Sequence, residues 1–97
     1  MKNTAKTTCP VAKVASLLSD LWTMLIVRDL MLKPMRFSEL HTSLHGVSTR
    51  TLTLKLQKLV ESGVISKNEP YYSITTKGKK LAAIYTEMTK YGKKYLA

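Results

Sequence analysis

The chain has 97 residues, 44% of them hydrophobic and 23% charged, which is the size and composition of one globular domain and excludes a largely disordered protein. Its 16 Lys and Arg residues against 6 Asp and Glu residues give a net charge of +10, which favours a polyanionic partner such as nucleic acid or an anionic membrane surface. The start lacks the apolar run of a signal peptide, and the longest apolar stretch, residues 21–32, is too short to span a bilayer. The single cysteine excludes an internal disulfide. We therefore expect a soluble cytoplasmic protein without a membrane partner.

The first element expected is a helix that begins at Cys9-Pro10, after a flexible polar tail over residues 1–8. Proline suits the first position of a helix, and apolar residues then recur at helical spacing, at Val11, Val14, Leu17 and Leu18. A second helix is predicted over residues 21–32, ending before Lys33-Pro34. Because this helix is apolar nearly all round, we expect it to be buried on most sides.

The segment from Arg36 to Gly63 has the pattern of two helices joined by a tight turn. Ser38 is expected to cap a short helix that ends near residue 44, and Gly46 to make the turn. Ser48 then caps a helix of about four turns that Gly63 ends, with leucines at positions 52, 56 and 59 on one face. Two helices with a short glycine-containing turn are a helix-turn-helix.

The hydrophobic pattern changes after Gly63. Residues 64–68 and 71–75 read as two short strands joined at Glu69-Pro70, a hairpin that would form a wing. From Thr76 a last helix runs to about residue 95, with an apolar stripe that either a second subunit or the chain's own domain must cover. The fold class predicted is mostly α with a small β-hairpin: a single winged helix-turn-helix domain over residues 9–97, with five helices and a short wing.

Packing the three leucines of the residue 48–63 helix inward turns Arg50, Thr53, Leu54 and Gln57 outward. The first half of such a helix faces base edges in DNA, so Arg50 and Thr53 are the main candidates for base contacts and Thr49 is the next. Leu54 either contacts a thymine methyl group or is a solvent-exposed leucine. Candidate phosphate contacts are basic side chains and helix starts, at Arg36, Ser38, Ser48, Lys55, Lys58 and Lys67. The later lysines, Lys77, Lys79 and Lys80, either contact DNA or only solubilise the surface.

Several motifs resemble the HxlR family of bacterial and archaeal regulators, which are relatives of the MarR winged helices. These are CPV at residues 9–11, LWTMLIVRDLM at 21–31, RFSEL at 36–40, HGVSTRTLTLKLQKLVESGVI at 45–65, YSITTKGKKL at 72–81 and Tyr91-Gly92. The resemblance implies a homodimer, formed by the first and last helices, that binds paired half-sites on double-stranded DNA. The implied interface consists of Val11, Val14, Leu18, Leu81, Ile84, Tyr85, Met88, Tyr91 and Tyr95. Two features depart from the family: the wing is shorter, and Leu54 stands where a polar residue is usual.

Cys9 is a candidate redox sensor. A helix start with Lys6 and Lys13 nearby favours the thiolate, and in some HxlR-like regulators the cysteine at this position senses oxidants or electrophiles. The alternative is a small, half-buried residue without a sensing role. His41 and His45 have a spacing that metal sites use, but no third ligand lies near them, so no metal is expected.

The sequence therefore predicts a sequence-specific, double-stranded DNA-binding transcriptional regulator that acts as a homodimer and responds to oxidants or electrophiles through Cys9. No enzyme activity and no cofactor are expected, since the chain lacks a phosphate loop, a carboxylate pair in an apolar context and a nucleophile with its base. A small-molecule or oxidant effector is a further candidate partner. The two alternatives are a low-specificity architectural DNA-binding protein and a winged-helix module that binds another protein.

Overall fold

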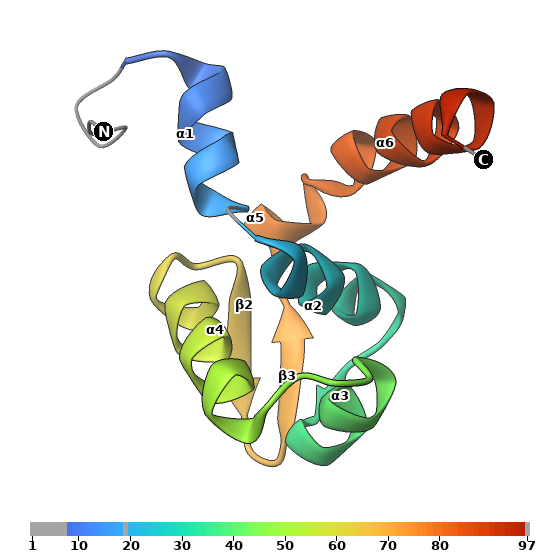
Figure 1. Ribbon diagram of the computed structural model, residues 1–97. Coiled ribbons are helices and arrows are strands. Elements are labelled where there is room, and N and C mark those ends of the chain that lie inside the picture. The colour runs from blue at the N-terminus through green and yellow to red at the C-terminus, as the bar shows by residue number, and fades with distance from the viewer. Residues whose placement is uncertain (1–7, 19, 97) are drawn as a thin grey trace.

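The computed structural model describes residues 8–18 and 20–96, in which helices pack against a small antiparallel sheet (Figure 1). The elements are α1 (Pro10–Leu17), α2 (Leu21–Leu32), β1 (Met35–Arg36), α3 (Phe37–Ser43), α4 (Thr49–Glu61), β2 (Ile65–Asn68), β3 (Tyr71–Ile74), α5 (Thr76–Lys79) and α6 (Ala82–Tyr95). The predicted winged helix-turn-helix with five helices is confirmed, with α5 as an additional single turn. The predicted tail falls almost wholly on residues 1–7, which lie outside the described residues.

The first two helices begin where the sequence predicts. Cys9 is the N-cap of α1 and Pro10 its first residue. Asp20 is the N-cap of α2, and its carboxylate accepts a hydrogen bond of 2.8 Å from the backbone N–H of Thr23. A carboxylate at this position satisfies one of the unpaired N–H groups of the first turn and interacts favourably with the helix dipole.

The predicted cap of α3 is wrong by two residues. Arg36, not Ser38, is the N-cap, and the carboxylate of Glu39 accepts a 2.8 Å hydrogen bond from the backbone N–H of Arg36. Because Glu39 reaches back in this way, the helix begins at Phe37 and Ser38 lies exposed in its first turn. The end of α3 near Leu44 is as predicted.

The wing belongs to a sheet of three strands in the order β1-β3-β2. The hairpin of β2 and β3 and its turn at Glu69-Pro70 confirm the prediction, while β1, which pairs Met35 with Tyr72, was not predicted. Two residues are too short to show strand periodicity. Lys67 of β2 also pairs with Tyr72, so Met35, Tyr72 and Lys67 lie side by side on the face of the sheet that turns toward the core.

The predicted last helix is interrupted. One turn, α5, is followed by a break at Lys80-Leu81, and α6 then leaves the body of the domain, as α1 does (Figure 1). Thr75 caps α5, because its Oγ1 accepts from the N–H of Gly78 at 3.0 Å. The same Oγ1 lies 2.6 and 2.9 Å from the carbonyl oxygens of Gly63 and Val64, which joins α5 to the start of β2.

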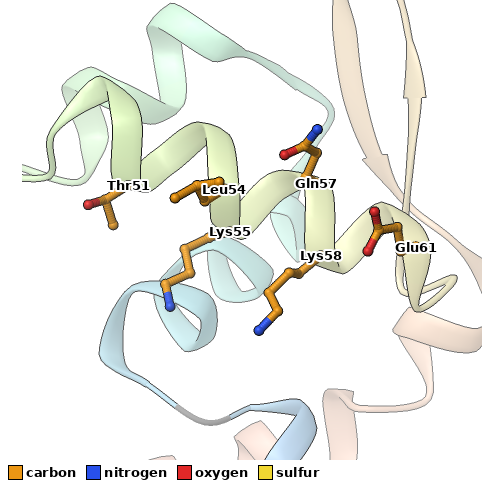
Figure 2. Close-up of a pocket in the computed structure, with 6 residues that line it drawn as sticks. All are labelled: Thr51, Leu54, Lys55, Gln57, Lys58 and Glu61. Carbon is orange, nitrogen blue, oxygen red and sulfur yellow. The ribbon is translucent and has the colours of Figure 1, made fainter.

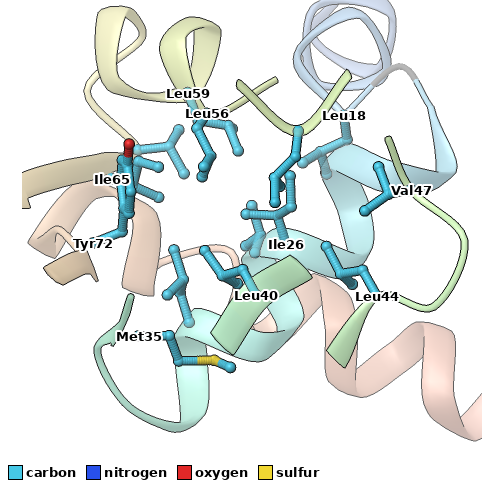
Figure 3. Close-up of a cluster of buried hydrophobic side chains, with 14 of the residues drawn as sticks. Leu18, Ile26, Met35, Leu40, Leu44, Val47, Leu56, Leu59, Ile65 and Tyr72 are labelled. Atoms are coloured by element: carbon cyan, nitrogen blue, oxygen red, sulfur yellow. The ribbon is translucent and has the colours of Figure 1, made fainter. Parts of the chain in front are cut away.

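The hydrophobic core lies between α2, α3, α4 and the sheet (Figure 3). As predicted, α2 is buried on most sides, with Ile26, Val27 and Leu30 almost inaccessible to solvent. Leu18 and Leu81 were predicted to contact a second subunit, but they are only 8% and 9% exposed and belong to this core. The chain's own packing already covers both side chains, and their contact with a second subunit stays a prediction.

A buried carboxylate connects α2 with α3. Asp29, 7% exposed, accepts hydrogen bonds from the hydroxyl of Ser43 at 2.7 Å and from the guanidinium of Arg28 at 2.9 Å. A buried charge is tolerated where such partners satisfy it. The pair with Ser43 holds the end of α3, and with it the turn that leads into α4, against the central helix.

Tyr85 attaches α6 to the central helix. Its hydroxyl donates a 2.7 Å hydrogen bond to the carbonyl oxygen of Met24, and burial raises the pKa of Tyr85 to about 12, although the charge of Arg28 partly opposes the rise. The side chain was predicted to contact a second subunit, but it packs against the chain's own core.

Tyr85 should make stability depend on pH in the alkaline range. Since its pKa is 10.0 in the unfolded chain and about 12 in the fold, the stability it contributes is complete below pH 10 and is lost as the pH rises toward 12. Tyr85→Phe should lower the free energy of unfolding by about 1 kcal/mol at pH 7, the typical value of one hydrogen bond. Urea unfolding at several pH values should show this difference shrinking between pH 10 and 12. A difference that stays constant over this range would contradict the assignment.

Candidate nucleic-acid interface

The turn before α4 holds this helix at the surface with one face exposed. Gly46 has a φ of +95°, a conformation that other residues rarely adopt, and Ser48 caps α4 by accepting a 3.0 Å hydrogen bond from the N–H of Thr51. Leucines 52, 56 and 59 are buried, as predicted. The opposite face therefore points to solvent, which confirms that Arg50, Thr53, Leu54 and Gln57 are exposed.

The first half of α4 carries the predicted base contacts. Thr49 and Arg50 are exposed in the first turn, so the guanidinium of Arg50 is accessible to a ligand. The hydroxyl of Thr53 donates to the carbonyl oxygen of Thr49 at 2.8 Å, so its oxygen can still accept a hydrogen bond, and the residue is exposed. Leu54 is 49% exposed. This face presents one strong donor group beside small apolar groups, a combination that suits base edges in a major groove.

A groove of about 310 Å³ separates α4 from the wing. Its walls come from both elements and consist of Thr53, Leu56, Gln57, Val60, Glu61, Lys67 and Tyr72. The ammonium group of Lys67 lies 5.6 Å from the centre of the Tyr72 ring and 2.9 Å from the carboxylate of Glu69. The hydrogen bond to Glu69 and the neighbouring Tyr72 raise the pKa of Lys67, so this lysine is a cation beside the exposed face of α4.

Gln57 was not among the predicted base contacts, although the sequence places it on the outward face. It lines the wing groove and also a second, more open depression of about 450 Å³ along α4, formed by Thr51, Leu54, Lys55, Gln57, Lys58 and Glu61 (Figure 2). A glutamine side chain both donates and accepts hydrogen bonds and matches the edge of adenine. The sequence signal that could have identified Gln57 is its spacing: Arg50 lies two helical turns earlier and Thr53 one turn earlier, so the three side chains share one face of the helix.

The predicted phosphate contacts do not form one surface. Lys58 points from α4 toward the junction of α1 and α2, and Lys55 lies beside it (Figure 2). The ammonium group of Lys55 lies 2.6 Å from the carboxylate of Asp20. Arg36 lies at the sheet instead, 5.3 Å from the centre of the Tyr71 ring. The structure thus brings Lys67 close to the face of α4 and places Arg36 at the start of α3.

The later lysines have different surroundings. The ammonium group of Lys77 donates a 2.7 Å hydrogen bond to the carbonyl oxygen of Ser62, the residue that ends α4. A cation at the carboxyl end of a helix interacts favourably with the helix dipole, so Lys77 stabilises the carboxyl end of α4. Lys79 and Lys80 are exposed on the adjoining turn.

An apolar surface, distinct from the face of α4, joins α1 to α6. A shallow groove of about 420 Å³ is lined by Pro10, Val11, Val14, Ala15 and Ile84. Further along α6, Met88, Tyr91 and Tyr95 are 48%, 60% and 61% exposed, and the rings of the two tyrosines lie 4.9 Å apart. Six of the nine predicted interface residues are therefore exposed here: Val11, Val14, Ile84, Met88, Tyr91 and Tyr95. Cys9 is exposed at the start of α1.

Other kinds of site have little support within residues 8–18 and 20–96. No group of three His, Cys, Asp or Glu side chains there could hold a metal ion. His41 stacks on Phe37, with the ring centres 6.5 Å apart. In the same part of the chain no single helix is long and apolar enough to cross a membrane, and only α1 and α2 taken together, bent by 83°, reach that length.

Comparison with known proteins agrees with this geometry. The HxlR-like helix-turn-helix family matches residues 17–97. The chain is 33% identical over 95 residues to sll1512 of Synechocystis sp., an uncharacterized HTH-type transcriptional regulator, covering 91% of this chain and 70% of that protein. It is 31% identical to the HTH-type transcriptional regulator YodB of Bacillus subtilis, covering 84% and 80%. The crystal structure of quinone-bound YodB superimposes with a TM-score of 0.84 at 30% identity, covering 90% of this chain and 100% of that one. This chain belongs to the HxlR-like family of winged helix-turn-helix transcriptional regulators.

Proposed function

We propose that the protein is a sequence-specific regulator that binds double-stranded DNA as a homodimer, with α4 in the major groove. The observation that carries this proposal is the exposed face of α4, where Arg50, Thr53 and Gln57 follow one another at helical spacing beside the basic wing. The net charge of +10 supplies the attraction to the phosphate backbone.

Base contacts come from the exposed face of α4. Arg50 donates two hydrogen bonds to a guanine, and Thr53 and Thr49 offer a hydroxyl oxygen and a methyl group to neighbouring bases. Leu54 contacts a thymine methyl group. Phosphates are held by the side chains of Arg36, Lys58 and Lys67 and by the first backbone N–H groups of α4 after Ser48; Ser38 offers a hydroxyl in the first turn of α3.

Dimerisation uses the apolar surface of α1 and α6. A glutamate in place of Met88 would have to be buried without a partner, which should raise the dissociation constant of the dimer by roughly 100-fold. Sedimentation equilibrium should give the wild type twice the 10.9 kDa mass of one chain and give Met88→Glu the mass of a monomer. Thr86→Glu adds the same charge at an exposed position on the opposite side of α6 and should remain dimeric. Equal behaviour of the two variants would contradict this interface.

A response to oxidants or electrophiles is proposed to act through Cys9. Two observations support it: Cys9 is exposed at the start of α1, next to Pro10 of the proposed dimer surface, and the similar protein YodB binds a quinone in its crystal structure. A single cysteine per chain limits the chemistry to an adduct with a quinone or similar electrophile, or to a disulfide with the second subunit formed by an oxidant. If Cys9 responds, a quinone should change the DNA affinity of the wild type and leave that of Cys9→Ser unchanged.

The proposed function is tested by measuring binding to the gene's own upstream DNA and to scrambled DNA of equal length, at several salt concentrations. Tight binding to the upstream DNA alone, weakening steeply with salt, is the expected result. Equal binding to both DNAs would favour an architectural protein of low specificity. No binding to either, even at low salt, would favour a module that binds another protein.

A further inference from the structure

The ion pair between α4 and the start of α2 lies beside the face of α4 that is proposed to contact DNA. The ammonium group of Lys55 and the carboxylate of Asp20 are 2.6 Å apart, and their side chains are only 28% and 31% exposed. The two side chains share a small cleft with Lys58 and Thr23. At this distance and degree of burial the pair is less screened than an ion pair in full contact with water.

Lys55 is otherwise placed to bind DNA. Its side chain lines the same face of α4 as Thr51, Leu54 and Gln57, yet its ammonium group turns away from that face, toward the α1–α2 junction (Figure 2). A lysine side chain has four flexible methylene groups, so a modest rotation would bring this ammonium group out to a phosphate flanking the helix. The contact with Asp20 is what opposes that rotation.

The side-chain carboxyl group of Asp20 is held in its ionised form by its hydrogen-bond partners. Partial burial by itself raises the pKa of its carboxyl group, but hydrogen bonds from Lys55 and Thr23 and the charge of Lys55 together hold it below the ordinary value of 3.8. The carboxylate also accepts a hydrogen bond from the N–H of Thr23, which fixes its position at the start of α2.

We propose that Asp20 is a positioning residue that keeps the charge of Lys55 from DNA phosphates and thereby limits the protein's sequence-independent affinity. The inference rests on the proposed function, because it assumes that α4 faces DNA. It assigns different roles to two lysines that share one cleft. Lys58, which is exposed, contributes to phosphate binding in the wild type, whereas Lys55, which pairs with Asp20, contributes only when Asp20 is neutral. Weak binding to random DNA favours specificity, because nonspecific sites compete with the operator.

Asp20→Asn tests this directly, since asparagine also caps helices well and the substitution removes little but the charge. The slope of log affinity against log salt on random duplex DNA should become steeper by about 0.9 for each protomer bound, and affinity at 0.1 M salt should rise roughly eightfold per protomer. Lys55→Gln should leave the wild-type slope nearly unchanged, and the Asp20→Asn, Lys55→Gln double variant should match Lys55→Gln. Lys58→Gln should make the slope shallower by about 0.9 per protomer.

The controls separate this effect from a general change in charge or fold. Glu87→Gln removes an exposed carboxylate on α6 and should change the slope far less than Asp20→Asn. Asp20→Ser, a second capping residue without charge, should repeat the result if Asp20→Asn folds poorly. A wild-type slope in both Asp20 variants, or a steeper slope that persists without Lys55, would overturn the inference while leaving the proposed function intact. If the wild type bound no DNA, both this inference and the proposed function would be contradicted.

Discussion

Replacing Gly78 with alanine is expected to destabilise the protein by about 3 kcal/mol, the upper part of the range for adding one carbon to a tightly packed interior. A Cβ atom at this position would lie 2.2 Å from the carbonyl oxygen of Val64 and 2.8 Å from the side chain of Ile74. The oxygen has little freedom to move, because it accepts hydrogen bonds from both the N–H and the hydroxyl of Thr75, at 3.0 and 2.9 Å. The clash therefore pushes α5 away from the start of β2.

The chain offers a matched control in Gly92, which lies in α6; apart from its chain neighbours and the backbone of its own helix, no described atom lies within 4 Å of the position of a Cβ. Gly92→Ala should be neutral or stabilise the protein by up to about 1 kcal/mol, since alanine is the better helix former. Urea unfolding followed by circular dichroism measures both variants: the midpoint should fall for Gly78→Ala and should stay the same or rise for Gly92→Ala. If Gly78→Ala unfolds at the wild-type midpoint, the close approach of α5 to β2 is not as tight as described.

Arg50→Ala is expected to weaken binding to the operator by about 2 kcal/mol, roughly 30-fold, and to reduce discrimination at one base pair of each half-site. The reason is geometric: a guanidinium donates two hydrogen bonds to one guanine, and Arg50 is exposed in the first turn of α4, where a helix in the major groove approaches base edges. Random DNA should lose much less affinity, since Arg50 is proposed to contact a base and not a phosphate.

Two comparisons make the Arg50 prediction specific. Arg50→Lys keeps the charge but loses the paired hydrogen bonds, so it should lose discrimination while its salt dependence stays near that of the wild type. Lys58→Ala should weaken binding to operator and random DNA alike. Binding curves on a panel of single-base operator variants measure these effects. Equal losses on operator and random DNA for Arg50→Ala would show that this side chain does not read a base.

The helices with strong local signals were predictable from the sequence. Cys9-Pro10 at the start of α1, the apolar run of α2 and Ser48 before α4 place their boundaries correctly, because caps and periodicity act within one or two turns. The outward face of α4 was equally predictable: once Leu52, Leu56 and Leu59 are buried, the helical period decides which residues face solvent. The exception is α3, where Glu39 reaches back to Arg36 and moves the cap by two residues.

The sequence by itself determined the bounds of α1, α2 and α4, where the hairpin turns and which side of α4 is exposed, since each of these depends on neighbouring residues. Only the tertiary structure decided that Leu18 and Leu81 belong to the core, that Gly78 of α5 packs closely against the carbonyl oxygen of Val64, and that Asp20 pairs with Lys55. The last two of these outcomes depend on contacts between residues that lie 14 and 35 positions apart in the chain. An apolar stripe or a lysine looks the same in sequence whatever covers it, so its partner follows only from the packing of the whole chain.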